Sequence, residues 1–487
     1  MRLPLALAAV LLLLAGGCGD SDEALVRVSI IAPDGVAAPT RGRTALVPEI
    51  ALATAAGLVG FDEEGRVVPA LADRWIITDD GLSYLFRLRN GTWLDGRPLT
   101  AEAIAQALRQ RLRGLRQTPL GLDLAAVAEI RPMAARVIEI RLASPLPDLL
   151  TLLAQPELGL TSKGLGGGPM SRDQQGVVTQ LEALPPEQLG QPGVEDWRER
   201  ARTLRVRVEP PAAAVARFDE GFADVVLGGR TDTLPLVKTA GLSRGTVQLD
   251  PVTGLFGLLV VNDDGFLASA DNREAIAMAI DREALLAGFN VAGWLPTSRI
   301  LGVAAEGANA VAAGERWLGF TMAERRQIAG DRVARWRSAA KDLAALRIAL
   351  PASPGGDLIY ARLRDDLAAI GLTTVRVPLA ARADLRLIDR VARYGRPEWF
   401  LNQLSCAAKA PVCSEEADAQ LAAAAKALDP QARSQLLRDA EARMSSANGF
   451  IPFARPLRWS LVRADVGGFA TNPWGVHPLL PLALAPR

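Results

Sequence analysis

The residue types that carry most enzyme and metal chemistry are scarce in this chain. Its 487 residues include a single histidine, His477, and three cysteines, Cys18, Cys406 and Cys413. A histidine-rich metal cage therefore cannot be built, and a Ser–His or Cys–His catalytic pair would have to use His477. Three cysteines are too few for a zinc ribbon or an iron–sulfur cluster held by four thiolates. We predict that the protein is not an enzyme and that it holds neither a metal nor a cofactor.

Binding of phosphate or nucleic acid is also disfavoured. The glycine-rich segment 164–168 would need Gly-Lys-Ser/Thr at the start of a helix to form a phosphate loop, and the residues that follow are Pro169 and Met170. The 55 Lys and Arg residues are balanced by 54 Asp and Glu, which gives a net charge of +1. Because a nucleic-acid binder would show a basic excess or stripe, we expect no nucleic-acid partner.

The first 18 residues have the pattern of a bacterial lipoprotein signal. Met1-Arg2 is a short basic region, and residues 3–15 form an apolar run that is too short to span a bilayer. Small residues at positions 15–17 precede Cys18, as in the lipobox, whose cysteine is lipidated and begins the mature protein. Two other interpretations are an ordinary cleaved signal with a coincidental cysteine and a permanent transmembrane anchor. We predict a lipid anchor at Cys18, followed by a polar tether.

The two remaining cysteines then lie outside the cytoplasm, where free thiols are a liability. Six residues separate Cys406 from Cys413. A disulfide that closes so short a loop stabilises a fold by about 2.5 kcal/mol in the chain-entropy model. A redox-active pair is the alternative, but it lacks C-x-x-C spacing. We predict a structural disulfide between these residues.

Helical and strand patterns alternate along the rest of the chain, which is 49% hydrophobic and long enough for about three domains. Residues 346–350 predict a strand, residues 358–370 a helix that ends at Gly371, and residues 374–377 a second strand. This β-α-β unit favours a parallel sheet. Thr100 is a candidate N-cap. Further strands are predicted at 26–31, 83–89, 137–142, 204–208, 224–227 and 256–261, and further helices at 44–58, 215–222, 272–286 and 417–444, the last interrupted at Asp429-Pro430.

Three segments resemble, in the expected order, the family 5 extracellular solute-binding proteins, the oligopeptide, dipeptide and nickel class that feeds ABC importers. They are an early block at residues 57–102, an element at residues 218–226 and a helix at residues 272–285. The early block contains Trp-Leu-Asp-Gly where the family usually has Trp-His-Asp-Gly, so Leu94 replaces the histidine. Shorter matches near the end extend the resemblance over about residues 44–475, nearly the whole mature chain.

The resemblance implies an α/β fold of the two-lobed periplasmic-binding-protein type (type II, similar to cluster C), with an extra subdomain in the first lobe and the ligand enclosed between the lobes. Such a protein works by hinge closure, because the closed state is favoured only by contacts that the ligand makes with both lobes. The expected boundaries are 1–17 for the signal peptide, 18–45 for the tether and first strand, 46–165 for the subdomain, 166–250 for the core of lobe I, 251–455 for lobe II and 456–487 for the return to lobe I.

The same resemblance implies a location and partners. We expect a monomeric, lipid-anchored protein on the periplasmic side of a bacterial envelope, which delivers a peptide-like or small organic solute to the permease subunits of an ABC importer. The alternative is an envelope sensor or chaperone-like lipoprotein of the same fold that takes no part in transport. A hydrolase is a third class, to which nothing in the sequence points.

The clearest departure from the family concerns the ligand. In peptide-binding members, an Asp a few residues before a Pro-x-x-Phe-Leu element pairs with the α-ammonium of the peptide. Here the element is Pro397 to Leu401, and Arg393 stands at the position of that Asp. An arginine would repel an ammonium and favour a carboxylate or phosphate. The ligand-binding candidates are therefore Arg393, Tyr394, Glu398 and Trp399, with an anionic or N-blocked solute.

Other interpretations of these residues remain open. A shift of one or two residues in the match, or a solvent-exposed Arg393, would leave Glu398 or Asp389 as the acid that meets an ammonium. Trp399 is either a wall of the cleft or a core residue. Three further residues are expected to be structural: Trp93 and Trp474 in the core, and His477. A lone histidine also disfavours nickel chelation.

Overall fold

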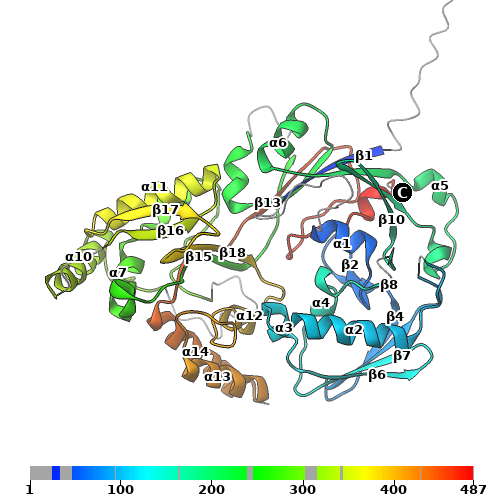
Figure 1. Ribbon diagram of the computed structural model, residues 1–487, viewed down its shortest axis with the longest axis horizontal. Helices are drawn as coiled ribbons and strands as arrows, with labels where there is room; N and C mark the ends of the chain where they lie inside the picture. Colours follow the sequence, from blue (N-terminus) through cyan, green and yellow to red (C-terminus); the bar gives the residue numbers. More distant parts are fainter. Residues whose placement is uncertain are drawn as a thin grey trace, which may run out of the picture.

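Two β-sheets covered by helices form the body of the molecule, and a smaller sheet lies beside them (Figure 1). The computed structural model describes residues 25–32, 47–93, 95–162, 165–238, 245–301, 315–339, 344–427 and 429–485. We call the part around the seven-stranded sheet lobe I, the part around the five-stranded sheet lobe II, and residues 56–166 the subdomain. The predicted signal peptide, Cys18 and Leu94 lie outside the described residues.

The sheet of lobe I is assembled from distant parts of the chain, in the order β10-β11-β12-β1-β13-β20-β14. The central strand β1 runs parallel to β12 and β13, and the other neighbouring pairs are antiparallel. Val28 and Ile30 of β1 are buried in one cluster with Ile50 of α1, whereas Ile31 packs with Phe218 of α6. The elements are β1 (Leu25–Ile31), β10 (Met170–Gln175), β11 (Val178–Ala183), β12 (Thr203–Glu209), β13 (Val225–Arg230), β14 (Val247–Leu249), β20 (Arg458–Val462), α1 (Pro48–Thr54), α5 (Trp197–Arg200), α6 (Pro211–Asp219), and the 3-10 helices η2 (Pro186–Leu189), η3 (Thr231–Leu236) and η5 (Pro481–Ala483).

The subdomain is built on four antiparallel strands in the order β4-β5-β7-β6, with α2 packed against β6 and β7. The predicted N-cap is present, because the Thr100 hydroxyl accepts a hydrogen bond from the backbone N–H of Ala103 at 3.3 Å. Ile104 and Leu108 of α2 are buried. The elements are β2 (Val59–Phe61), β3 (Val67–Pro69), β4 (Ala72–Ile77), β5 (Ser83–Leu88), β6 (Val127–Ala134), β7 (Val137–Leu142), β8 (Thr161–Ser162), β9 (Leu165–Gly166), α2 (Ala101–Leu115), α3 (Pro119–Asp123), α4 (Leu149–Leu153) and η1 (Pro156–Leu158).

The sheet of lobe II has the order β17-β16-β18-β15-β19 and contains the predicted β-α-β unit. Strands β16 and β17 are parallel and are joined by α11, whose N-cap Ser353 accepts a hydrogen bond from the backbone N–H of Gly356. Figure 1 shows α10 and α11 along this sheet, and α12 to α14 next to the subdomain. The elements are β15 (Gly254–Val260), β16 (Leu346–Leu350), β17 (Thr374–Pro378), β18 (Leu385–Val391), β19 (Phe450–Ala454), α7 (Ala270–Ala279), α8 (Arg282–Ala287), α10 (Met322–Ala339), α11 (Pro354–Ala368), α12 (Pro397–Asn402), α13 (Glu415–Lys426), α14 (Pro430–Ala447) and η4 (Gly265–Ala268).

Three predicted helices differ from the observed ones. The helix predicted at residues 44–58 ends earlier, since α1 stops at Thr54. The helix predicted at residues 272–286 is divided into α7 and α8, because Asp281 leaves the helix and accepts a hydrogen bond from the backbone N–H of Ala284 as the N-cap of α8. The helix predicted at residues 215–222 begins earlier, at Pro211, since proline is well suited to the first turn of a helix. Apolar periodicity identified these segments but placed their ends inaccurately.

Disulfide formation agrees with the prediction. Cys406 and Cys413 are bonded, with their Cα atoms 5.1 Å apart, in the turn that links α12 to α13. Within the described ranges, none of the helices combines the length and apolarity needed to cross a bilayer. The same part of the chain holds no group of three or more His, Cys, Asp or Glu side chains placed to bind a metal ion.

The two lobes meet through a hinge and through a packed interface. The chain passes from lobe I to lobe II between β14 and β15 and returns between β19 and β20. At this crossing Asp389 of β18 forms an ion pair with Arg458 of β20 at 2.7 Å, and Arg230 of β13 lies 4.0 Å from the same carboxylate. Away from the hinge, one cluster of buried side chains runs from the subdomain into α12, α13 and α14. The lobes are therefore in contact on both sides of the space between them.

Candidate ligand-binding site

A cleft of about 1070 Å³ lies between lobe I, the subdomain and lobe II. Lobe I contributes α1 and the start of β10, the subdomain contributes η1 and the exposed side of α2, and lobe II contributes the end of β18. The volume is at the upper end of the usual range for small-molecule sites, about 300–1,000 Å³. The cleft is therefore large enough for a small organic solute that would touch both lobes.

Four arginines from all three parts of the molecule line this cleft. They are Arg111 of α2, Arg172 of β10, Arg390 of β18 and Arg393, which follows β18. Among the described residues, Glu157 is the single acidic member of the lining. Among the described residues, no ion-pair partner lies within 4.0 Å of Arg111, Arg172 or Arg390. The lining therefore carries a formal charge of +3, from four cations and one anion.

Two of these arginines, Arg390 and Arg393, lie close together on the lobe II side of the cleft, at the end of β18. Arg393 donates a hydrogen bond to Glu157 Oε1 of the subdomain at 2.7 Å, which links the two lobes across the cleft. The Arg390 guanidinium makes one long hydrogen bond, to Gln403 Oε1 at 3.5 Å. Surrounding protein and the neighbouring charge of Arg393 lower the pKa of Arg390, although its side chain stays accessible from the cleft. An incoming anion would relieve this repulsion.

Aromatic side chains form the rest of the cleft wall. Trp399 of α12 is buried and lines the cleft, and its indole N–H has no hydrogen-bond partner in the part of the chain that the structure describes. Trp474 and Phe61 lie with ring centroids 5.9 Å apart, and both face the same space. The expectation that Trp474 is a core residue is wrong, because it is only half-buried and lines the cleft. Trp93 is buried, as expected.

The structure brings only part of the predicted site together. Arg393 and Trp399 line the cleft, but Tyr394 and Glu398 do not. Tyr394 is buried and its hydroxyl donates to Asp123 Oδ1 of the subdomain at 3.3 Å. Glu398 forms an ion pair with Arg433 of α14. Successive residues of a turn and of a helix point in different directions, so neighbours in sequence do not share the cleft.

Two other residues considered from sequence, Asp389 and His477, also lie outside the cleft lining. Asp389 is engaged by Arg458 at the hinge, outside the cleft lining. His477 is buried, with its Nε2 3.2 Å from Asp250 and its Nδ1 3.2 Å from the Asn472 amide, which is a structural environment. Of the acids considered from sequence, none of the described ones reaches the cleft.

Three cleft arginines were missed by reasoning from sequence. Arg111 and Arg172 lie more than 200 residues before Arg393, and only the fold places them around one space. Arg390 carried a weak local signal, since it stands three residues before Arg393 at the end of a predicted strand. Strand ends are common positions for ligand contacts in α/β proteins, so the position of Arg390 is typical of a ligand-binding residue.

Gly65 supports the aromatic wall, and its replacement is a test of this geometry. It adopts a φ of +79°, and a Cβ there would lie 2.8 Å from the Trp474 ring, whose N–H donates to the Gly65 carbonyl at 2.8 Å. We expect Gly65→Ala to cost about 1–3 kcal/mol of unfolding free energy, measured by urea denaturation. Gly96→Ala is the control, because Gly96 has a similar φ of +81° and no atom of the described residues lies within 4 Å of its Cβ position. Equal losses in both variants would contradict a clash with Trp474.

Comparison with known proteins agrees with this geometry. The model of the bacterial extracellular solute-binding proteins, family 5 middle region, matches residues 66–184. These residues cover most of the subdomain and strands β10 and β11 of lobe I. The chain is a relative of the family 5 solute-binding proteins. The prediction that it is not an enzyme is confirmed by this relationship, because the related proteins bind solutes for transport and are periplasmic.

Two curated relatives extend the comparison. The probable deoxycholate-binding periplasmic protein YgiS of Escherichia coli is 37% identical over 121 residues, but the matched part spans only 21% of this chain and 22% of that protein. The probable di/tripeptide-binding protein 5 of Pseudomonas aeruginosa is 24% identical over 86% of this chain and 87% of its own length. Similarity is therefore strongest locally, while the weaker match reaches across most of the chain.

Solved structures establish the fold. The OppA protein of Haemophilus influenzae, crystallised with the peptide RPPGFSPFR, superimposes with a TM-score of 0.79 over 95% of this chain and 99% of its own, at 17% identity. The predicted fold class, a two-lobed periplasmic binding protein of mixed α/β structure, is confirmed. At 17% identity, this structural similarity defines the fold but not the ligand. The chemistry of the ligand must be inferred from the residues of the cleft.

Proposed function

We propose that this protein is a lipid-anchored, extracytoplasmic binding protein that carries a small anionic solute to an ABC importer. The arginine-rich lining of the cleft is the observation that supports the anionic solute most strongly. Four arginines and one glutamate surround a space where peptide-binding members of the family have an acid for the α-ammonium. Arginine favours carboxylate and phosphate groups, because its planar fork can donate two parallel hydrogen bonds.

The importer partner and the lipid anchor are further parts of this proposal. Family 5 proteins deliver peptides or small solutes to ABC importers, and the two lobes with a hinge between them suit delivery by closure around the solute. The related E. coli protein is named for deoxycholate, a carboxylate, which agrees with an anionic cargo. Lipidation of Cys18 would hold the protein at the membrane surface near a permease.

Arg390 is the residue whose removal tests the proposal most directly. Because it has no ion-pair partner among the described residues, Arg390→Gln removes a ligand contact without leaving an internal charge unpaired. We expect the affinity for an anionic ligand to fall by about 10- to 100-fold, the usual worth of a hydrogen bond to a charged group. Binding would be measured by isothermal titration calorimetry on the chain that begins at Gly19, which contains every described residue.

The ligand series must distinguish anions from ordinary peptides. Free-amine peptides, their N-acetylated forms and small dicarboxylates would first be screened by thermal shift, since saturating ligand stabilises the folded state by about 2.7 kcal/mol at 100 times its Kd. Arg364→Gln is the matched control, because Arg364 is exposed on α11 and forms its ion pair with the equally exposed Asp365. Preference for free-amine peptides, or an equal loss in both variants, would refute the anionic cargo.

A further inference from the structure

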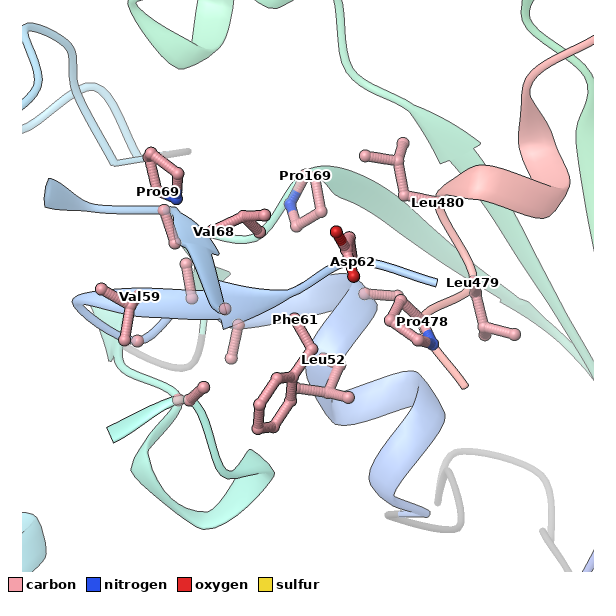
Figure 2. Close-up of a pocket in the computed structure, with 18 of the residues that line it drawn as sticks. Leu52, Val59, Phe61, Asp62, Val68, Pro69, Pro169, Pro478, Leu479 and Leu480 are labelled. Atoms are coloured by element: carbon pink, nitrogen blue, oxygen red, sulfur yellow. The ribbon is translucent and has the colours of Figure 1, made fainter. Parts of the chain in front are cut away.

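A second, mostly apolar chamber lies in lobe I behind the wall of the cleft. Its volume is about 540 Å³, within the range of small-molecule sites. Figure 2 shows apolar side chains from α1, β2, β3, the residue before β10 and the C-terminal segment around this space, among them Leu52, Val68, Pro169 and Leu480. Phe61 and Gln155 belong to the lining of both spaces, so the chamber and the cleft are neighbours with a shared wall.

One buried cation stands in this apolar lining. Arg89 follows β5, is 6% exposed, and its guanidinium donates to the backbone carbonyls of Leu189 and Gly167, residues that also line the chamber. The guanidinium therefore lies at the chamber wall. No carboxylate of the described residues lies within ion-pair distance of it. Burying a charge without a counter-charge is costly, and two neutral carbonyls compensate it only in part.

Two acids in the same lining do not neutralise Arg89. Asp62 and Glu63 belong to the turn between β2 and β3, whereas Arg89 is held between Gly167 and Leu189. Asp62 is already engaged, because it accepts hydrogen bonds from the Arg66 backbone N–H at 2.8 Å and from Arg66 Nε at 2.7 Å. The chamber therefore combines an apolar body with a positive charge at one part of its wall.

We propose that this chamber binds an amphipathic monocarboxylate, with the carboxylate on Arg89 and the apolar chain among the leucines and prolines of the lining. A carboxylate would supply the missing counter-charge, and removal of the apolar chain from water would favour binding. The site is distinct from the inter-lobe cleft and does not depend on the nature of the transported solute. An occupant would pack behind Phe61 and so support the cleft wall from inside.

Binding of decanoate, 1-decanol and decylamine to the chain that begins at Gly19 tests the site. We expect decanoate to bind, and Arg89→Met to weaken it by about 10- to 100-fold while decanol binding changes less than about threefold. Val68→Trp, which fills the chamber, should abolish binding of both probes. Because Arg89→Met also removes two backbone contacts, circular dichroism would confirm its fold, and Val68→Trp gives an independent measurement.

Cleft variants separate this site from the proposed function. Arg390→Gln should leave decanoate binding unchanged, whatever its effect on the transported anion. No measurable binding of decanoate to the unaltered chain would overturn the proposal. So would an equal loss of decanoate and decanol in Arg89→Met, a loss caused by Arg390→Gln, or tighter binding of decylamine than of decanoate, which would assign the charge recognition to Glu63.

Discussion

We expect the unfolding free energy of the unaltered protein to fall as the pH rises from about 4 to about 7, and we expect Asp123→Asn to abolish this dependence. Asp123 ends α3 of the subdomain and is 4% exposed at the contact with lobe II. Burial raises the pKa of its carboxyl group to about 7, a shift that the charge of Arg393 and hydrogen bonds from Tyr394 and Asn402 oppose. Its other close charged neighbour, Asp148, raises the pKa further.

The direction of the pH effect follows from proton binding. Between the ordinary aspartate pKa near 4 and the folded value near 7, the folded protein keeps a proton that the unfolded chain has released. Stability therefore falls as the pH rises through this window and is constant above it. A shift of about three units corresponds to at most about 4 kcal/mol. Opening of the lobes would hydrate Asp123, so closure should likewise be favoured at the lower pH.

Chemical denaturation at a series of pH values between 4 and 8.5 would measure this effect. Because other carboxyl groups also titrate, the relevant quantity is the difference between the Asp123→Asn variant and the unaltered protein at each pH. Asp365→Asn is the control, since Asp365 is exposed on α11. A difference that is independent of pH would show that Asp123 is ionised throughout. Ligand affinity at pH 5.5 and 8 would test the coupling to closure.

The largest effect on stability is expected for Asp389→Ala at the hinge. The Asp389 side chain is 6% exposed and meets Arg458 of β20, itself 12% exposed, at 2.7 Å. Its backbone carbonyl also accepts a hydrogen bond from Arg230 at 3.2 Å. Removing one member of a buried ion pair leaves the other charge uncompensated, which costs about 3–5 kcal/mol. We expect a loss of that size in urea denaturation.

Asp384→Ala provides a matched comparison for this prediction. Asp384 forms an ion pair with Arg347 at 2.7 Å in the same sheet, but entirely within lobe II, and Arg347 is 37% exposed. Water can solvate Arg347 after the substitution, so the loss should be smaller than for Asp389→Ala. Small-angle X-ray scattering should show a broader range of lobe arrangements only in the Asp389 variant. Equal losses and unchanged scattering would exclude a special role of Asp389 at the hinge.

The cleft illustrates how far local patterns reach. The match to Pro397 to Leu401 placed Arg393 near the ligand, and the structure puts it in the cleft lining. The same reasoning included Tyr394 and Glu398, which point to the subdomain and to α14 instead. Spacing along the chain defines which residues are near one another, but the direction of each side chain depends on the backbone geometry around it.

Taken by itself, the sequence determined the features that depend on neighbouring residues. The Thr100 cap, the parallel β-α-β unit, the disulfide between Cys406 and Cys413 and the resemblance to family 5 all rest on short-range patterns, whose physical causes act within a few residues. Only the tertiary structure decided which distant charges meet. Asp123 and Tyr394, which share a hydrogen bond, are 271 residues apart, and Arg111 of the subdomain lines the same cleft as Arg390 of lobe II. Such contacts arise from packing and burial, which no local spacing records.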